Sequence, residues 1–195
     1  MKFASTPIAG VWQVHTEPRA DARGSFTRLY CAEAFDAVMP GLCFVQANLS
    51  HTLQRGTLRG LHLQRAPAQE YKLVRCLRGH VFDVAADLRP LSITYGQWFA
   101  LELSDRNHCQ LLIPPGVAHG FQALSDDVQL LYQHSTAFDA KLEDGVRHDD
   151  PSLAIDWPLP VRLLSPRDRQ LRLLQAAATE AGSASSLGAN IEAAA

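Results

Sequence analysis

The chain has 195 residues, the length of one ordinary domain and enough to bury a substantial core. Hydrophobic residues make up 47% of it and charged residues 19%, as in soluble globular proteins. The formal net charge of -2 excludes a strongly basic surface, so nucleic acid is not expected as a partner.

Local features argue against two further classes of protein, those held together by disulfides or zinc and those that are secreted or span a membrane. The four cysteines lie far apart and form no CxxC motif, so free thiols are expected rather than disulfides or a zinc site. The first residues show no basic segment followed by an apolar block. No apolar run reaches the ~20 residues that a membrane-spanning helix needs. We therefore expect a cytoplasmic protein that does not bind membranes.

In chain order, a short helix is predicted over residues 31–38, and strand signals then dominate. Apolar segments over 72–77 and 80–88 flank Arg78-Gly79, and the alternation in the second segment predicts a β-hairpin. Turn residues separate further predicted strands over 97–103, 109–113, 120 onward and 128–132. Short strands at this spacing favour an antiparallel sandwich or barrel.

A second helix is predicted from Ser165 through Leu174. Ser165 can cap it, Pro166 suits its first position, and Asp168 falls where a capping-box acid belongs. From about residue 176 the composition becomes rich in Ala, Ser and Gly, which predicts a mobile tail rather than a docked terminal helix. We expect a single domain over residues 1–175 and a tail over 176–195.

The segment from Arg59 to Gln64, followed by Lys72, brings a histidine and two cations together. Such a set suits proton abstraction beside a carbonyl group. A metal-binding barrel would offer His-x-His here, but the second position is Gln64, a poorer ligand for transition metals than imidazole. Metal binding at His62 is therefore disfavoured.

Two other side chains each allow two interpretations. Tyr132 ends an apolar strand and is either a core or rim residue or a proton donor, since an ordinary tyrosine with a pKa of about 10 is protonated near neutrality. Asp168 is either a helix cap or the partner that fixes the tautomer of an imidazole. Its local sequence favours the cap.

Basic side chains could together hold a diphosphate, although each taken singly is better explained as a solvated surface cation. No glycine-rich phosphate loop is present in the sequence, so side chains would have to bind the phosphates. The residues concerned are Arg23, Arg59, Lys72, Arg147 and Arg167.

Ordered sequence blocks between about residues 7 and 168 carry a resemblance to a known family. They are Asp21–Gly24, Phe44–Ser50, Leu58–Gln64, Lys72–Arg75, Gly79–Val84, Phe99–Ser104, Ile113–Phe121, Leu131-Tyr132 and Asp149–Pro158. In these blocks the chain resembles the dTDP-4-dehydrorhamnose 3,5-epimerases, which are cupin-type nucleotide-sugar epimerases.

The resemblance implies a mainly β, cupin-type jelly-roll β-barrel with a few short helices. It implies a homodimer that shares strands near the N-terminus, and a reaction that needs neither cofactor nor metal. The implied reaction inverts C3 and C5 of a nucleotide-diphosphate 4-keto-6-deoxyhexose, converting dTDP-4-dehydro-6-deoxyglucose to dTDP-4-dehydrorhamnose. The product would serve dTDP-rhamnose and lipopolysaccharide biosynthesis.

The resemblance also implies residue roles. His62 would remove the proton next to the C4 ketone, Asp168 would orient His62, and Tyr132 would return a proton on the opposite face. Lys72 would stabilise the enolate oxygen. Further substrate contacts are implied at Arg23, Arg28, Gln46, Asn48, Arg59, Lys72, His119, Phe138, Glu143 and Arg167.

The chain departs from the family pattern at three positions. Arg28 stands where a glutamate is usual, His148 replaces a tryptophan, and Gln133 follows Tyr132 where lysine is frequent. Three alternatives stay open: a single-centre epimerase or related isomerase acting on another nucleotide sugar, a non-catalytic sugar-binding cupin, and a metal-dependent cupin oxygenase.

Overall fold

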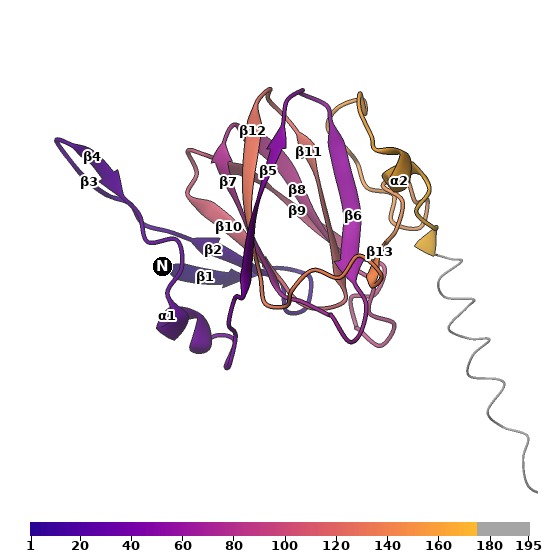
Figure 1. The fold of residues 1–195 in the computed structure, drawn as a ribbon, viewed down its shortest axis with the longest axis horizontal. Helices are drawn as coiled ribbons and strands as arrows, with labels where there is room; N and C mark the ends of the chain where they lie inside the picture. The colour runs from indigo at the N-terminus through magenta and orange to yellow at the C-terminus, as the bar shows by residue number, and fades with distance from the viewer. Residues whose placement is uncertain (175–195) are drawn as a thin grey trace, which may run out of the picture.

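The computed structural model describes residues 1–174, which form two antiparallel sheets (Figure 1). In spatial order, the six-stranded sheet contains β1 (Lys2–Ser5), β2 (Trp12–His15), β10 (Cys109–Ile113), β7 (Lys72–Arg78), β12 (Val128–His134) and β5 (Gln46–Thr52). The five-stranded sheet contains β13 (Glu143–Gly145), β6 (Leu58–Gln64), β11 (Val117–Ala123), β8 (His80–Asp87) and β9 (Trp98–Ser104). The expected mainly β barrel is thus confirmed, and the tail predicted over residues 176–195 lies outside the described residues.

The main hydrophobic core lies between the two sheets, because alternate side chains of facing strands point toward each other. Val74 and Leu111 come from the six-stranded sheet, and Phe121 and Leu103 come from the five-stranded sheet. Burying such side chains contributes about 1.5–3 kcal/mol each relative to exposure. This core closes one part of the barrel, and the cavity described below occupies another.

The hairpin predicted over residues 72–88 is wrong. β7 pairs with β10 and β12, whereas β8 pairs with β11 and β9, so the two segments belong to different sheets. Gly79 carries the chain across with a φ of +81°, and a Cβ there would lie 2.7 Å from the Ser125 Oγ. The sequence correctly indicated a glycine turn at Gly79. It did not indicate that the turn joins the two sheets rather than two neighbouring strands of one sheet, because that depends on residues distant in the chain, such as Ser125.

Both predicted helices are present, and the second is shorter than expected. α1 (Ala32–Asp36) covers the outer face of the six-stranded sheet, where Phe35 packs with Leu73 and Leu112. α2 (Pro166–Arg169) is capped as predicted, since the Asp168 amide donates to the Ser165 Oγ at 3.0 Å. It ends at Arg169 rather than continuing to Leu174.

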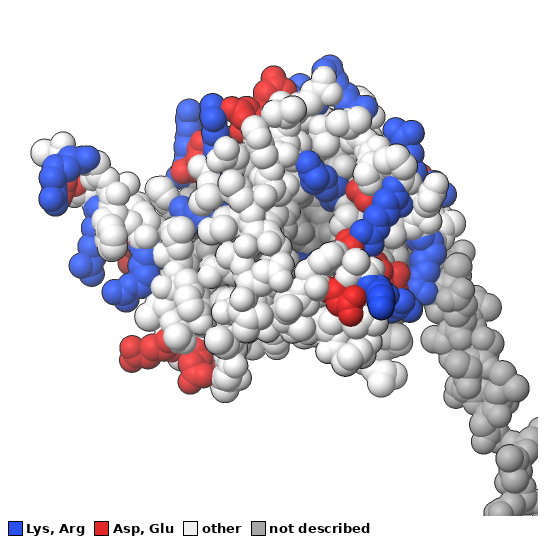
Figure 2. All heavy atoms as spheres, viewed as in Figure 1, with Lys and Arg blue, Asp and Glu red and all other residues white. Residues whose placement is uncertain are grey.

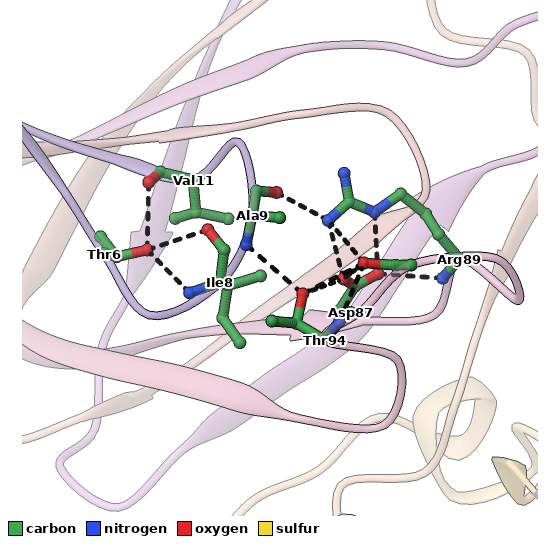
Figure 3. Close-up of polar contacts among 8 residues, drawn as sticks. Thr6, Ile8, Ala9, Val11, Asp87, Arg89 and Thr94 are labelled. Carbon is green, nitrogen blue, oxygen red and sulfur yellow. Dashed lines mark hydrogen bonds and ion pairs between the residues drawn. The ribbon is translucent and has the colours of Figure 1, made fainter.

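A polar network fixes the loop after β8 to the N-terminal segment (Figure 3). The Asp87 carboxylate is completely buried and accepts hydrogen bonds from Arg89, Ser92 and Thr94. Arg89 also donates to the Ala9 carbonyl at 2.6 Å, and the Ala9 amide donates to Thr94 at 3.3 Å. The network ties the two ends of this loop to the turn between β1 and β2.

One small hairpin stands apart from both sheets. β3 (Arg19–Asp21) pairs only with β4 (Gly24–Phe26), and the ribbon projects away from the barrel (Figure 1). All of its side chains are exposed, including Phe26 at 78%. Within residues 1–174 no helix is long and apolar enough to cross a membrane.

Candidate active site

A cavity of about 620 Å³ opens between the two sheets, and the segment over residues 163–168 lies along its rim. Figure 2 views the molecule onto this hollow face, with basic and acidic side chains around the depression. The six-stranded sheet contributes β5, β7 and β12 to the walls, and the five-stranded sheet contributes β6 and β11. A pocket of this size, apolar with a few convergent polar groups, is typical of a small-molecule site.

His62 and Asp168 form a hydrogen-bonded pair in this cavity. The His62 Nε2 lies 2.9 Å from the Asp168 Oδ1, although the residues are 106 positions apart. The second carboxylate oxygen accepts the Gly60 amide at 3.2 Å. Gly60 has a φ of +118°, and a Cβ there would lie 2.5 Å from the Gly120 Cα, so only glycine fits between β6 and β11.

Asp168 is buried and stays ionised because of this pairing. Burial by itself raises the pKa of a carboxyl group, but the hydrogen bond and charge of His62, with the Gly60 amide, hold the pKa of Asp168 below its ordinary value. Asp168 was expected from local sequence to cap α2. The Ser165 hydroxyl does that instead, which leaves the Asp168 carboxylate available to orient His62.

The other ring nitrogen of His62 faces a second acidic group. His62 Nδ1 lies 3.9 Å from the Glu143 Oε1, beyond hydrogen-bond length. Glu143 is instead held by an ion pair with Arg167. Nδ1 therefore has no hydrogen-bond partner among residues 1–174, and it is the nitrogen of this ring that can accept a proton in the cavity.

Lys72 is a buried cation next to His62. Its Nζ donates to the His62 carbonyl oxygen at 3.1 Å and lies 3.4 Å from the Glu70 Oε1. An ammonium group has three donors, so one hydrogen remains for a ligand. Burial lowers the pKa of Lys72, and the charges of Glu70 and Glu143 oppose that shift.

Tyr132 lines the opposite wall of the cavity, on β12. Burial and the nearby charge of Asp83 raise the pKa of Tyr132 well above its ordinary value, against the effect of Arg59. Its ring contacts the His119 ring edge-on at a centroid distance of 5.6 Å. His119 is itself fixed by the buried Asp83 at 2.8 Å. Tyr132 is therefore a protonated hydroxyl held in a rigid setting.

Most of the predicted substrate contacts also reach this cavity. Arg59 is held by Thr52 at 3.1 Å, and Phe138 is 54% exposed at the edge. Gln46 is not on the wall, but it accepts the Phe138 amide at 3.0 Å and so supports that residue. The predicted contacts that do line the cavity are Asn48, Arg59, Lys72, His119, Phe138, Glu143 and Arg167.

Besides Gln46, two predicted contacts do not line the cavity, Arg23 and Arg28. Arg23 is at the tip of the β3–β4 hairpin, where its side chain is 89% exposed and pairs with Asp21 at 2.5 Å. Arg28 lines a separate surface hollow with Phe26 and Cys31. In a single chain neither residue reaches the cavity.

Sequence reasoning gave no catalytic or substrate-binding role to several residues of the cavity wall, among them the polar residues Glu70 and His134. Their spacing carried a signal. His134 follows Tyr132 by two positions on a strand, and Glu70 precedes Lys72 by two, so each pair points to the same side where the backbone is extended. The two side chains meet, with the His134 Nδ1 2.8 Å from the Glu70 Oε2.

The donor set of the cavity suits proton transfer. Across residues 1–174 no group of three or more His, Cys, Asp or Glu side chains is arranged to hold a metal ion. An oriented imidazole on one sheet and a protonated phenol on the other can each exchange a proton with a molecule bound between them. Fold and site thus define a barrel enzyme of the isomerase class.

Comparisons with known proteins agree with that class. The sequence profile described as dTDP-4-dehydrorhamnose 3,5-epimerase matches residues 5–176. A dTDP-4-dehydrorhamnose 3,5-epimerase of Pseudomonas aeruginosa is 47% identical over 158 residues, covering 79% of this chain and 86% of the relative. A dTDP-4-dehydrorhamnose 3-epimerase of Streptomyces niveus is 44% identical over 183 residues, covering 93% and 87%.

A solved structure shows the same fold. It is dTDP-6-deoxy-D-glucose-3,5-epimerase from Legionella pneumophila in complex with dTDP-4-keto-L-rhamnose, with a TM-score of 0.84 and 38% identity. The superposition covers 89% of this chain and 93% of the other. The chain belongs to the dTDP-4-dehydrorhamnose 3,5-epimerase family, and the expected cupin-type epimerase fold is confirmed.

Proposed function

We propose that this enzyme inverts C3 and C5 of a nucleotide-diphosphate 4-keto-6-deoxyhexose, with dTDP-4-dehydro-6-deoxyglucose as substrate and dTDP-4-dehydrorhamnose as product. One observation carries the proposal. The oriented His62–Asp168 pair comes from one side of the cavity, Tyr132 comes from the other sheet, and the Lys72 ammonium lies next to His62. Epimerisation needs proton transfer at opposite faces of an enolisable carbon, which this arrangement offers.

The proposed steps use the atoms that remain available to a substrate in the cavity. Asp168 holds the Nε2 proton of His62, so the Nδ1 lone pair takes the proton from the carbon next to the ketone. The electrons of the C–H bond move into an enolate whose oxygen accepts the remaining Lys72 hydrogen. Tyr132 then donates its proton to the other face of that carbon. His62 then releases its extra proton to water, and the Tyr132 phenolate takes one from water. With both groups reset, the same sequence at the second carbon completes the reaction.

The remaining cavity residues suit a nucleoside diphosphate. Arg59 and Arg167 are guanidinium groups at the cavity wall, and such groups match phosphate oxygens. The exposed ring of Phe138 offers a surface on which a base can stack. The family name and the dTDP-sugar bound to the Legionella relative favour thymidine as the nucleoside.

We infer that the enzyme is a homodimer in the cytoplasm. The projecting hairpin carries Arg23 and Phe26 away from its own barrel, and Leu49 and Leu77 are exposed on the outer face of the six-stranded sheet. A second copy that covers this face would bury those side chains and could receive the hairpin. Free thiols at all four cysteines favour a reducing compartment.

Solvent exchange tests the reaction. The enzyme is incubated with dTDP-4-dehydro-6-deoxyglucose in deuterated water, and the product is analysed by NMR. Deuterium at both C3 and C5 is the expected result. His62→Ala should reduce exchange by at least about a hundredfold, since a general base contributes 10²–10⁴ in rate. No exchange by the wild-type enzyme would contradict the proposal and favour a non-catalytic sugar-binding cupin.

A second candidate function is inversion at one carbon only. It is favoured by the Streptomyces niveus relative, whose name gives a 3-epimerase. The same incubation distinguishes the two, because a single-centre enzyme incorporates deuterium at one carbon. Tyr132→Phe sharpens the result: it should retain proton removal by His62 and lose inversion, so label appears at a carbon whose configuration is unchanged.

A further inference from the structure

His134 joins three separate groups of the cavity. Its ring stacks on Tyr132 at a centroid distance of 6.0 Å and an interplanar angle of 12°. Its Nε2 lies 3.2 Å from the Asn48 Nδ2, across the pair of strands β12 and β5. Its Nδ1 lies 2.8 Å from the Glu70 Oε2. The side chain is only 13% exposed, so these contacts occur inside the cavity wall.

Glu70 extends this contact to the catalytic cation. The Glu70 Oε1 lies 3.4 Å from the Lys72 Nζ, while Oε2 is held by His134. Burial alone would raise the pKa of Glu70, but the His134 hydrogen bond and the Lys72 charge lower it. An ionised carboxylate therefore lies between the imidazole and the ammonium. Together with the His62 carbonyl, this carboxylate holds the Lys72 ammonium in place.

The hydrogen-bond roles at His134 are fixed by its partners. An ionised Glu70 can only accept, so the Nδ1 must carry a hydrogen. The Asn48 Nδ2 is a donor, so the Nε2 must accept and carries none. His134 is therefore neutral in this arrangement, with its proton on Nδ1. Because one ring nitrogen donates and the other accepts, the imidazole can hold Glu70 and Asn48 in fixed positions relative to each other.

We propose that His134 is a positioning residue of the epimerase, which aligns Lys72 through Glu70 and orients the Asn48 amide toward the sugar. The inference rests on the proposed function and adds to it a residue outside the proton-transfer set. Tyr132, which the imidazole supports by stacking, belongs to the same unit. Catalysis by Lys72 and binding by Asn48 thus depend on one ring.

Protonation of His134 would break this alignment. The charged and polar groups that face the ring are Tyr132 on its own strand, Asn48 on β5, and Glu70 with Lys72 at the start of β7. A second hydrogen on Nε2 would meet the Asn48 Nδ2 donor, so that amide would have to turn. A positive imidazole would also attract Glu70 away from Lys72.

Two substitutions separate the contact of His134 with Glu70 from its contact with Asn48. In His134→Asn the amide nitrogen lies near the original Nδ1 and can still donate to Glu70, but the Asn48 contact is lost. In His134→Gln the amide lies near the original Nε2 and can still meet Asn48, but Glu70 loses its donor. We expect H134N mainly to raise KM, and H134Q to lower kcat on the order of tenfold, the effect of losing a hydrogen bond to a charged group.

The split between kcat and KM distinguishes positioning from simple packing. A packing defect would affect both His134 variants alike, whereas positioning predicts that mainly KM changes in H134N and mainly kcat in H134Q. His80→Gln is the matched control, since His80 forms a comparable but more exposed pair with Glu102 at 3.0 Å, away from the cavity. It should keep the wild-type constants. Wild-type constants in both His134 variants, or the same change in both, would overturn the inference.

A measurement on the resting enzyme tests the role of His134 independently of the proposed reaction. Nitrogen-15 NMR of the resting wild-type enzyme should show the His134 proton on Nδ1, and Glu70→Gln should shift that signal. A proton on Nε2, or no response to E70Q, would contradict the arrangement. Wild-type enzyme that exchanges no solvent deuterium while showing this tautomer would defeat the proposed function alone.

Discussion

Two buried aspartates, Asp168 and Asp87, are the centres of two different polar networks. Asp168 is 3% exposed and Asp87 is 0% exposed, and each accepts several hydrogen bonds. The donors to the Asp87 side chain lie within seven residues along the chain. Two donors to Asp168, His62 and the Gly60 amide, lie 106 and 108 residues away on β6, in addition to the nearby Ser165 hydroxyl. Only the second network faces the cavity.

The chemistry of the donors separates the two sites further. Asp87 is surrounded by a guanidinium and two hydroxyl groups, which do not exchange protons with a ligand near neutrality. Although burial raises its pKa, Arg89, Ser92 and Thr94 lower the pKa of Asp87 to about 2. Asp168 instead holds an imidazole whose second nitrogen is open to the cavity. The Asp87 carboxylate, whose hydrogen bonds are all made within its own loop, thus stabilises the fold. The Asp168 carboxylate, which is paired with a titratable imidazole, takes part in catalysis.

The largest expected effect is on catalysis at Asp168. Asp168→Asn keeps the size of the side chain but cannot hold the His62 tautomer by charge. We expect kcat for C3 and C5 exchange to fall by about 10²–10⁴. The midpoint of urea unfolding should move little, because Asn can still accept the Gly60 amide. A variant with wild-type exchange rates would show that the pair is structural only.

The next effect is on stability at Asp87. Asp87→Asn removes the charge that balances Arg89 inside the loop, and should lower the free energy of unfolding by about 2 kcal/mol. Exchange activity of the folded enzyme at 25 °C should be unchanged, because the network lies away from the cavity. Urea titrations of both proteins, with activity measured at zero urea, provide the check. Equal unfolding midpoints for the two proteins would contradict a stabilising role of the Asp87 carboxylate.

The pH dependence of stability sharpens the same comparison. The pKa of Asp87 is lower in the folded protein, about 2, than its ordinary value of 3.8. Its contribution is therefore complete above about pH 5 and is lost as the pH falls toward 2. The difference in unfolding free energy between wild type and D87N should shrink across that window. A difference that stays constant from pH 6 to pH 2.5 would argue against a depressed pKa.

The smallest effect concerns a single donor of the Asp87 network. Thr94→Val removes the hydroxyl that lies 2.6 Å from the Asp87 Oδ2 and leaves the methyl contacts. Because Arg89 and Ser92 still satisfy the carboxylate, we expect a loss of about 1 kcal/mol in unfolding free energy. Thermal unfolding at pH 7 measures it, with exchange activity as the control. A loss larger than that of D87N would mean that Thr94 matters through Ala9 instead.

Local sequence predicted the parts of the fold that depend on neighbours along the chain. Alternation and turn residues placed the strands at 97–103, 109–113 and 128–132, and the structure has them with ends shifted by two residues at most. The Ser165 cap was predicted and is present at 3.0 Å. Both the failed hairpin at 72–88 and the early end of α2 depend on distant contacts, which a local pattern does not contain.

For the site, the sequence by itself determined the inventory of groups: His62 and Lys72 near one another, a tyrosine at a strand end, and a family resemblance that assigned their roles. Only the tertiary structure decided their relations. It directed Asp168 to His62 rather than to its own helix, assembled Glu70, His134 and Asn48, and set Arg23 and Arg28 outside the cavity. The physical reason is that strand pairing, together with the packing of α2 against β6, brings residues 60 to 110 positions apart within hydrogen-bond distance. Local sequence does not encode which of these contacts form.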